Sequence, residues 1–206
     1  MRLTTDDSHS GHRSDWGEYY RRVAGRPPRR SLLVALEKSG AGAGRLALDL
    51  GCGDGRDTVE LLRRGWRVLA IDAEERAIAR LKERPDLPES ALLETRCARF
   101  EAVELPPAGL INASFALPLV APEDFPVLWQ KLVAALTPGG RFAGQLFGER
   151  DSWRGEKAIT FLPRAAVERL LEGFEVELCE EEESDATTPY GKAKHWHLFH
   201  IVARKR

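Results

Sequence analysis

Three glycines spaced two residues apart, Gly51, Gly53 and Gly55, follow an apolar run in the stretch LALDLGCGDGRD (residues 46–57). Glycine adopts positive φ without steric cost and lets the backbone approach a ligand closely. In open α/β sheets, ligands bind where a buried strand ends and the chain turns into a helix. The stretch therefore predicts a ligand-binding turn between a strand and a helix.

The charged residues beside these glycines separate two classes of ligand. A loop that holds the pyrophosphate of a dinucleotide has a third glycine three residues after the second, where this chain has Arg56. The carboxylates of Asp49 and Asp54 would repel a pyrophosphate and attract an ammonium group. Asp72 ends the next apolar run, about 20 residues later, where a carboxylate can accept both ribose hydroxyls. S-adenosylmethionine (SAM) has the ribose and the cationic arm, and it has no phosphate.

Apolar runs and amphipathic stretches alternate along the chain, which predicts strands joined by helical crossovers. Signals typical of helices cover residues 14–25, 26–40, 55–65, 73–84, 122–136 and 163–171. Runs typical of strands cover residues 45–50, 66–72, 91–98, 108–116, 141–148, 174–182 and 194–205. Only a polar loop joins the last two runs, so we expect them to pair antiparallel. The predicted fold class is α/β, a Rossmann-like doubly wound sheet of about seven strands, mostly parallel with an antiparallel last strand.

The length, charge and cysteine content of the chain limit its domain organisation, its partners and its location. A chain of 206 residues predicts a single domain. The net charge of −1 gives no general attraction to nucleic acid. Three cysteines, an odd number, favour a reducing compartment over a disulfide framework. No apolar run is long enough to span a bilayer, so we expect a cytoplasmic protein without a membrane partner.

Several motifs resemble those of a known family. LDLGCGDGRD together with VLAID is similar to motif I and the following acidic position of class I SAM-dependent methyltransferases, and LTPGGRF resembles their turn into the fifth strand. SDWGEYYRRVAGRPPRRSL resembles the N-terminal lid of small-molecule methyltransferases of the tellurite-resistance and thiopurine type. The resemblance extends from about residue 16 to the end. It implies an N-terminal tail and lid helix over residues 1–30 and a single SAM-binding methyltransferase domain over residues 31–206. It implies in-line transfer of a methyl group from SAM to a small-molecule acceptor, with S-adenosylhomocysteine (SAH) as the product.

The resemblance also implies roles for individual residues. The predicted cofactor-binding residues are Asp49, Gly51, Cys52, Gly53, Asp72, Ala73, Phe100 and Asn112. Asp49 and the glycine loop would hold the methionine moiety, Asp72 the ribose and Ala73 the adenine. Cys52 is interpreted mainly as a small buried filler. Arg99 stands where many members have an acid that contacts the adenine amino group, and Phe100 could instead stack on the ring.

The acceptor would lie at the same edge of the sheet, among aromatic and polar side chains. The predicted acceptor residues are Tyr19, Tyr20, Ser114, Phe115, Trp153 and Trp196. His195 and His197 share one face of the last strand and are the candidate catalytic bases, with strand packing as the alternative. Arg22 and Arg30 could meet the cofactor carboxylate or lie on a solvated helix face. No metal motif is recognised.

Three other functions stay open at this stage. The arginines between residues 21 and 30 would suit a methyltransferase that acts on RNA or protein. The departure at Arg99 would suit a SAM-binding protein without catalysis. The glycine loop could still belong to a dinucleotide-dependent oxidoreductase. The identity of the acceptor, its reacting atom and the oligomeric state are left open.

Overall fold

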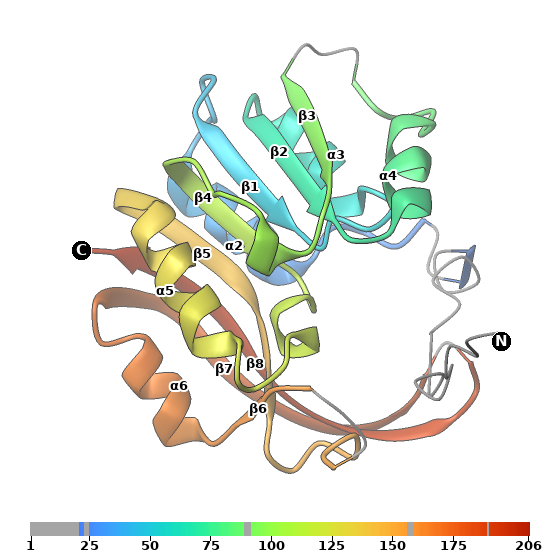
Figure 1. Cartoon of the computed structure of the whole chain (residues 1–206), viewed down its shortest axis with the longest axis vertical. Helices are drawn as coiled ribbons and strands as arrows, with labels where there is room; N and C mark the ends of the chain where they lie inside the picture. The colour runs from blue at the N-terminus through green and yellow to red at the C-terminus, as the bar shows by residue number, and fades with distance from the viewer. Residues whose placement is uncertain (1–20, 23–24, 89–91, 156–158, 189) are drawn as a thin grey trace, which may run out of the picture.

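The structure is a computed structural model that describes residues 21–22, 25–88, 92–155, 159–188 and 190–206. One sheet forms its centre, in the order β3-β2-β1-β4-β5-β8-β7, with β6 beside β5 (Figure 1). The strands are β1 (Leu46–Leu50), β2 (Arg67–Asp72), β3 (Leu93–Cys97), β4 (Ala108–Ala113), β5 (Leu136–Gly148), β6 (Phe161–Leu162), β7 (Phe174–Thr187) and β8 (Ala193–Lys205). The helices are α2 (Arg30–Ser39), α3 (Arg56–Arg63), α4 (Glu75–Lys82), α5 (Phe125–Ala135) and α6 (Arg164–Leu170), with 3₁₀ turns η1 (Phe100–Ala102) and η2 (Leu117–Leu119).

The predicted fold class is confirmed. Strands β1 to β5 pair in parallel, and β8 runs antiparallel to both β5 and β7. One difference is β6, which pairs Phe147 with Phe161 and is too short to leave a periodic pattern in the sequence. A second is that β5 begins at Leu136, inside the stretch expected to be helix and turn, because Ala108 of β4 pairs with Leu136 there.

Helices cover both faces of the sheet, and this is why most residues of the central strands β1, β2 and β4 are apolar and buried (Figure 1). Successive residues of a strand point to opposite faces and enter two different cores. Val68 packs in the core that holds Leu32 of α2 and Leu61 of α3. Its neighbour Leu69 packs in the core that holds Trp129 of α5. The α/β layers therefore hold the ends of the parallel strands in fixed positions.

The strand register brings polar residues together at one edge of the sheet. Asp49 of β1 pairs directly with Asn112 of β4, and Asp72 ends β2 opposite Cys97 of β3. The chain leaves β1 between β2 and β4, where the strand order reverses. Ligands of doubly wound sheets bind outside the carboxyl ends of the strands at this switch point.

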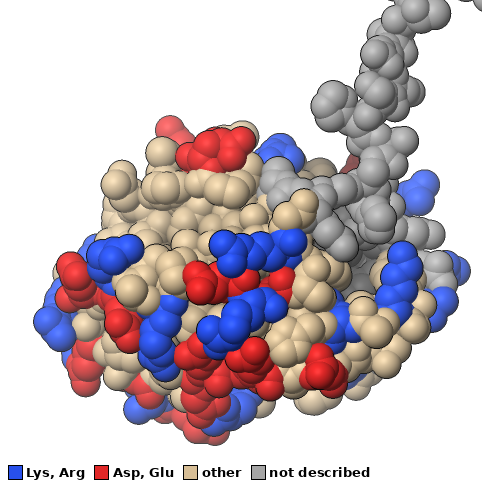
Figure 2. Space-filling view, turned by 90° about the horizontal axis from the view of Figure 1, so that it is seen from below, with Lys and Arg blue, Asp and Glu red and all other residues tan. Residues whose placement is uncertain are grey.

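The β7–β8 hairpin is the longest element, with strands of 14 and 13 residues. It continues past the parallel strands and curves beneath them (Figure 1). Seen from below, its side of the molecule carries intermingled acidic and basic side chains, without a continuous basic channel on that face (Figure 2). Among the described residues, none of the helices has the length and apolar character needed to cross a membrane.

Candidate active site

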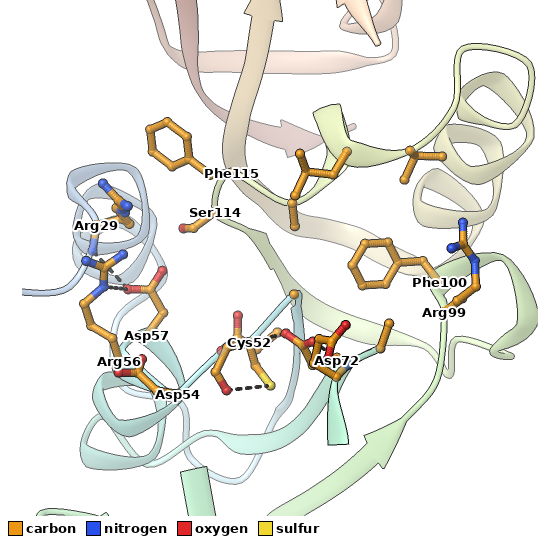
Figure 3. Close-up of a pocket in the computed structure, with 18 residues that line it drawn as sticks. Arg29, Cys52, Asp54, Arg56, Asp57, Asp72, Arg99, Phe100, Ser114 and Phe115 are labelled. Atoms are coloured by element: carbon orange, nitrogen blue, oxygen red, sulfur yellow. Dashed lines mark hydrogen bonds and ion pairs between the residues drawn. The ribbon is translucent and has the colours of Figure 1, made fainter. Parts of the chain in front are cut away.

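A pocket of about 330 Å³ lies at the carboxyl ends of β1, β2 and β4 (Figure 3). Its walls come from the loops after β1 to β4 and from residues at the starts of α2 and α3. Arg29 and Phe115 lie at one end, Phe100 and Arg99 at the other, and Asp72 between them (Figure 3). Its volume is in the range of small-molecule sites.

The glycine loop forms the floor of the pocket and needs its glycines. Gly51, Gly53 and Gly55 have φ of 69°, 58° and 83°. A Cβ on Gly51 would lie 2.5 Å from the Cβ of Ala116, and one on Gly55 would lie 2.1 Å from Cδ1 of Leu81. Side chains would therefore be strained by the backbone and would clash with the opposite wall or with α4.

Asp72 fastens this loop to the end of β2. Its Oδ2 accepts the N–H of Gly53 at 2.9 Å, and its Oδ1 accepts the N–H of Glu74 at 2.9 Å. Burial raises the pKa of Asp72, and the two backbone hydrogen bonds oppose that rise. Each carboxylate oxygen has a second lone pair, so Asp72 can still accept hydroxyl groups of a ligand in the pocket.

A buried polar network lies behind the loop. Asp49 accepts from Thr58 Oγ1 at 2.5 Å and from Asn112 Nδ2 at 2.8 Å. The same Asn112 Nδ2 donates to Oδ2 of Asp57 at 3.1 Å, and Ser114 Oγ donates to Asn112 Oδ1 at 3.1 Å. Burial and the nearby Asp57 raise the pKa of Asp49 to about 7. Asn112 is fully buried and outside the pocket lining, so the geometry favours its positioning Asp49; direct contact with the cofactor stays a prediction.

Arg29 and Arg56 line the end of the pocket near Phe115 (Figure 3). Neither was predicted from the sequence as a cofactor-binding residue. Arg56 Nε lies 3.7 Å from Asp57 Oδ1, which also accepts the backbone N–H of Arg29 at 3.0 Å. Both guanidinium groups lie on that side of the cavity (Figure 3). The two predicted arginines lie elsewhere: Arg30 pairs with Glu180, and Arg22 lies over the ring of Tyr190. The position directly after the glycine loop was the available signal for Arg56.

The opposite end has the residues expected around the adenine. Ala73, Arg99 and Phe100 all line it, and the carbonyl oxygen of Phe100 accepts from Lys131 Nζ at 3.3 Å. Cys52 also lines the pocket at 7% exposure, and burial raises the pKa of its thiol well above the usual value. Such a thiol stays neutral and packs as a small buried side chain.

Of the predicted acceptor residues, the structure places Ser114 and Phe115 in the pocket wall. Phe115 has φ of +56°, rare for a bulky residue and a mark of functional sites. Its N–H donates to Gln145 Oε1 at 3.1 Å, and Arg29 Cζ lies 4.3 Å from its ring centroid. Trp196 contacts the Phe115 ring with a centroid distance of 6.2 Å.

The remaining predicted acceptor residues are divided. Trp153 packs on Trp196 with ring centroids 5.6 Å apart, and both stand behind Phe115 rather than in the pocket lining. Tyr19 and Tyr20 lie outside the described residues, as does most of the predicted lid helix.

The two candidate bases are not brought to the pocket. His195 and His197 alternate with Trp196 along β8, so they point to the other face of the hairpin. His195 bonds Asp185 at 2.7 Å and Glu183 at 3.1 Å, and the bond to Asp185, with that to Glu183, raises its pKa. His197 bonds Glu181 at 2.8 Å. A catalytic role for either stays a prediction that this geometry does not favour. No group of metal-binding side chains occurs among the described residues.

Comparison with known proteins identifies the domain. Residues 47–140, which contain the glycine loop and Asp72, match the family model described as a methyltransferase domain. This match agrees with the Rossmann-like sheet and with the glycine loop described above, and it supports a SAM-dependent methyltransferase domain. The prediction of this family, made from the glycine loop and its acidic partner, is confirmed.

The chain is also similar to individual proteins. The chain is 32% identical over 97 residues to carboxy-S-adenosyl-L-methionine synthase of Shewanella loihica, a match that covers 45% of this chain and 40% of that protein. The chain thus spans less than half of that relative. Among solved structures, TehB from Haemophilus influenzae has a TM-score of 0.74 at 18% identity, covering 93% of this chain and 67% of TehB.

Two further structures share the fold and are named as methyltransferases. The 1,6-didemethyltoxoflavin-N1-methyltransferase of Burkholderia thailandensis, with its substrate and SAH bound, has a TM-score of 0.64 at 20% identity and covers 94% of this chain and 81% of its own. The N-methyltransferase NodS of Bradyrhizobium japonicum, in complex with SAH, has a TM-score of 0.67 at 18% identity and covers 92% and 97%. These likenesses show the fold.

Proposed function

We propose that this chain transfers the methyl group of SAM to a small-molecule acceptor by in-line displacement and releases SAH. The observation that carries the proposal is the pocket itself. A glycine loop with positive φ at three positions lies between the carboxylates of Asp49 and Asp72, in a cavity of about 330 Å³. The carboxylates on both sides of the glycine loop suit the cationic sulfonium of SAM.

The residues of the pocket divide among the parts of the cofactor. Asp72 would accept the ribose hydroxyls, while Ala73 and Phe100 would border the adenine. Arg29 and Arg56 offer two guanidinium groups at the opposite end, and a carboxylate such as that of methionine is the usual partner of such groups. The sulfonium would then lie between these two ends, beside the glycine loop.

The protein's part in the reaction would be alignment and exclusion of water. Bound SAM supplies a methyl group on a good leaving group. Ser114 and Phe115 would form the acceptor side of the wall, where Phe115 is held toward the cavity by its bond to Gln145. A soft acceptor such as a thiolate would need no base, which agrees with a pocket lining that lacks a histidine among the described residues.

A small acceptor and a cytoplasmic location are the finer parts of this proposal. The size of the pocket supports the first, as do two structural neighbours whose names give a methyltransferase activity, one of them solved with its small-molecule substrate. Three free cysteines, of which Cys97 is exposed, support a reducing compartment. The mixed charges of the face in Figure 2 give no support to an RNA substrate.

The proposal is tested by incubating the protein with SAM and a panel of thiols, selenite, amines and phenols, and measuring SAH by mass spectrometry. We expect acceptor-dependent SAH formation, abolished in Asp72→Ala and retained in the surface variant Glu123→Gln. SAM binding without turnover on any acceptor would favour the non-catalytic alternative. In a parallel incubation that also supplies a carboxyl donor, formation of carboxy-S-adenosyl-L-methionine would favour the activity named for the Shewanella relative.

A further inference from the structure

A buried lysine lies behind the acceptor side of the pocket. Lys194 of β8 forms an ion pair with Asp151, in the loop after β5, and both side chains are completely buried. The Lys194 ammonium also lies over three aromatic rings, 3.9 Å from the centroid of Trp153, 4.2 Å from that of Trp196 and 5.8 Å from that of Phe147. A lysine is rarely buried unless paired, and this one is paired within an aromatic box.

Stability alone is a poor reason for such a pair. Removing two charges from water is costly, and replacing a buried ion pair with apolar residues is often neutral or stabilising. Such an ion pair can instead fix the orientation of the side chains around it. An ammonium is attracted to the face of an aromatic ring, so Lys194 favours ring orientations that turn the faces of Trp153 and Trp196 toward it.

The partner carboxylate joins the two elements that form the box. Asp151 Oδ1 accepts the backbone N–H of Trp153 at 2.9 Å, and its Oδ2 accepts that of His197 at 3.3 Å. The loop after β5 is tied to β8 a second time, because Ser152 N–H donates to the carbonyl of His195 at 3.0 Å. The position of the lysine and the positions of both indoles therefore depend on one carboxylate.

The box continues into the pocket wall. Two rings of this cluster contact the Phe115 ring edge to face. The centroid of Trp196 lies 6.2 Å from that of Phe115 with an interplanar angle of 83°, and the centroid of Phe147 lies 6.5 Å from that of Phe115 with an interplanar angle of 63°. Phe115 lines the pocket beside Ser114. Thus a continuous set of ring contacts connects the Lys194 ammonium to the cavity, while Asp151 balances the charge and leaves the wall apolar.

We propose that Lys194 is a positioning residue: held by Asp151, it orients Trp153 and Trp196 and, through Trp196, the Phe115 ring against which the acceptor binds. The acceptor part of this inference rests on the proposed methyl transfer, and the ring-orienting part does not. Lys194 does not line the cofactor pocket, so its loss is expected to weaken acceptor binding and to leave cofactor binding intact.

The test uses Lys194→Ala and chemical rescue. The part removed from the side chain corresponds to n-propylammonium, so this ion can refill the box with its charge, while 1-propanol refills it without charge. We expect the near-ultraviolet circular dichroism of the tryptophans in Lys194→Ala to differ from that of the wild type. Adding n-propylammonium should restore the wild-type spectrum, and adding 1-propanol should not. Lys192→Ala, at an exposed lysine two residues away, should match the wild type. Equal restoration by the alcohol, or an unchanged spectrum, would overturn the proposal.

A second variant, Lys194→Met, covers the case in which the alanine variant does not fold. It fills the box without charge, so we expect a folded protein with an altered tryptophan spectrum and unchanged SAH affinity. With an acceptor found in the panel, its KM should rise about tenfold or more while the KM for SAM stays constant. Wild-type spectrum and wild-type acceptor KM in Lys194→Met would refute the role. Absence of turnover in the wild type would refute the proposed function alone, because the spectral result still decides the orientation of the rings.

Discussion

Asp49 is a carboxyl group held where ionisation is difficult. It is 1% exposed, and Asp57, at 5% exposure, shares the amide of Asn112 with it. Burial first and the charge of Asp57 second raise the pKa of Asp49 from 3.8 to about 7. Between these values the folded chain binds more protons than the unfolded chain, so this group makes stability fall as pH rises from about 4 to about 7.

Cofactor binding should release a proton from this site. A cationic ligand favours the ionised form of Asp49, so the complex holds fewer protons and the affinity for SAM should rise from about pH 6 to about pH 8. Calorimetric titration in phosphate and in Tris, whose ionisation heats differ, measures the release directly. Asp57→Asn removes the second carboxylate, lowers the pKa of Asp49 and should reduce the release, whereas Glu123→Gln should leave it as in the wild type. Binding heats that do not depend on the buffer would contradict this account of Asp49.

Comparing alanine variants of Gly51 and Gly44 separates the effect of backbone strain from the effect of a steric clash. Gly51→Ala combines φ of +69° with a Cβ 2.5 Å from the Cβ of Ala116, in the pocket wall. Gly44→Ala has the same kind of strain, with φ of +77°, and no atom within 4 Å of its Cβ. Both should lose about 1–3 kcal/mol in urea unfolding. Only Gly51→Ala should also lower SAH affinity, by about tenfold or more; equal affinities in the two variants would show that the loop tolerates a side chain.

At the scale of elements, the β7–β8 hairpin depends on a network of charges. Glu181 of β7 accepts from His197 of β8 at 2.8 Å, from Arg150 of the loop after β5 at 2.9 Å and from Arg164 of α6 at 2.9 Å. The hydrogen bond to His197, with those to the two arginines, lowers the pKa of Glu181 to about 2. One carboxylate thus connects the hairpin to two further segments.

Glu181→Gln should lower the urea midpoint of unfolding near neutral pH. Because the pKa of Glu181 is lowered on folding, its contribution is complete above about pH 4.5 and is lost as pH falls toward about 2. The difference between variant and wild type should therefore shrink on acidification. Glu175→Gln, which loses a single exposed pair with Arg204 at 3.0 Å, should have a much smaller effect. A loss for Glu181→Gln that stays constant with pH would mean that charge is not its cause.

The elements that the sequence predicted well are those with local signals. The glycine spacing and the acid at the end of the next apolar run located β1, β2 and the pocket between them, because each signal lies within one strand–helix turn. Arg29 and Gln145 were missed, since their roles depend on packing between segments far apart in the chain. Lys194 had a readable signal: it alternates with His195 and therefore shares the face of Trp196. His195 and His197 were placed together on one face of β8, but Trp196 lies on the opposite face, so the histidines and Trp196 cannot both point toward the pocket.

At the scale of the whole molecule, the sheet separates two tasks. The parallel half, β1 to β4, supplies the glycine loop, Asp72 and the end of the pocket lined by Ala73 and Phe100, while β5 and β8 supply the aromatic cluster behind Phe115. The boundary between them is the end of β4, where Asn112 contacts the cofactor side and Phe115 contacts the aromatic side. Changes in the β8 half are therefore expected to alter acceptor use with little effect on cofactor affinity.

The central claim is that the glycine loop holds a SAM-type ligand, and calorimetric titration with SAH tests it most directly. NAD serves as the competing ligand and Asp72→Ala as the variant, with Glu123→Gln as a matched loss of a carboxylate at the surface. We predict micromolar binding of SAH to the wild type and to Glu123→Gln, no binding to Asp72→Ala, and no binding of NAD to any of them. Tight binding of NAD, or SAH affinity unchanged in Asp72→Ala, would contradict the account.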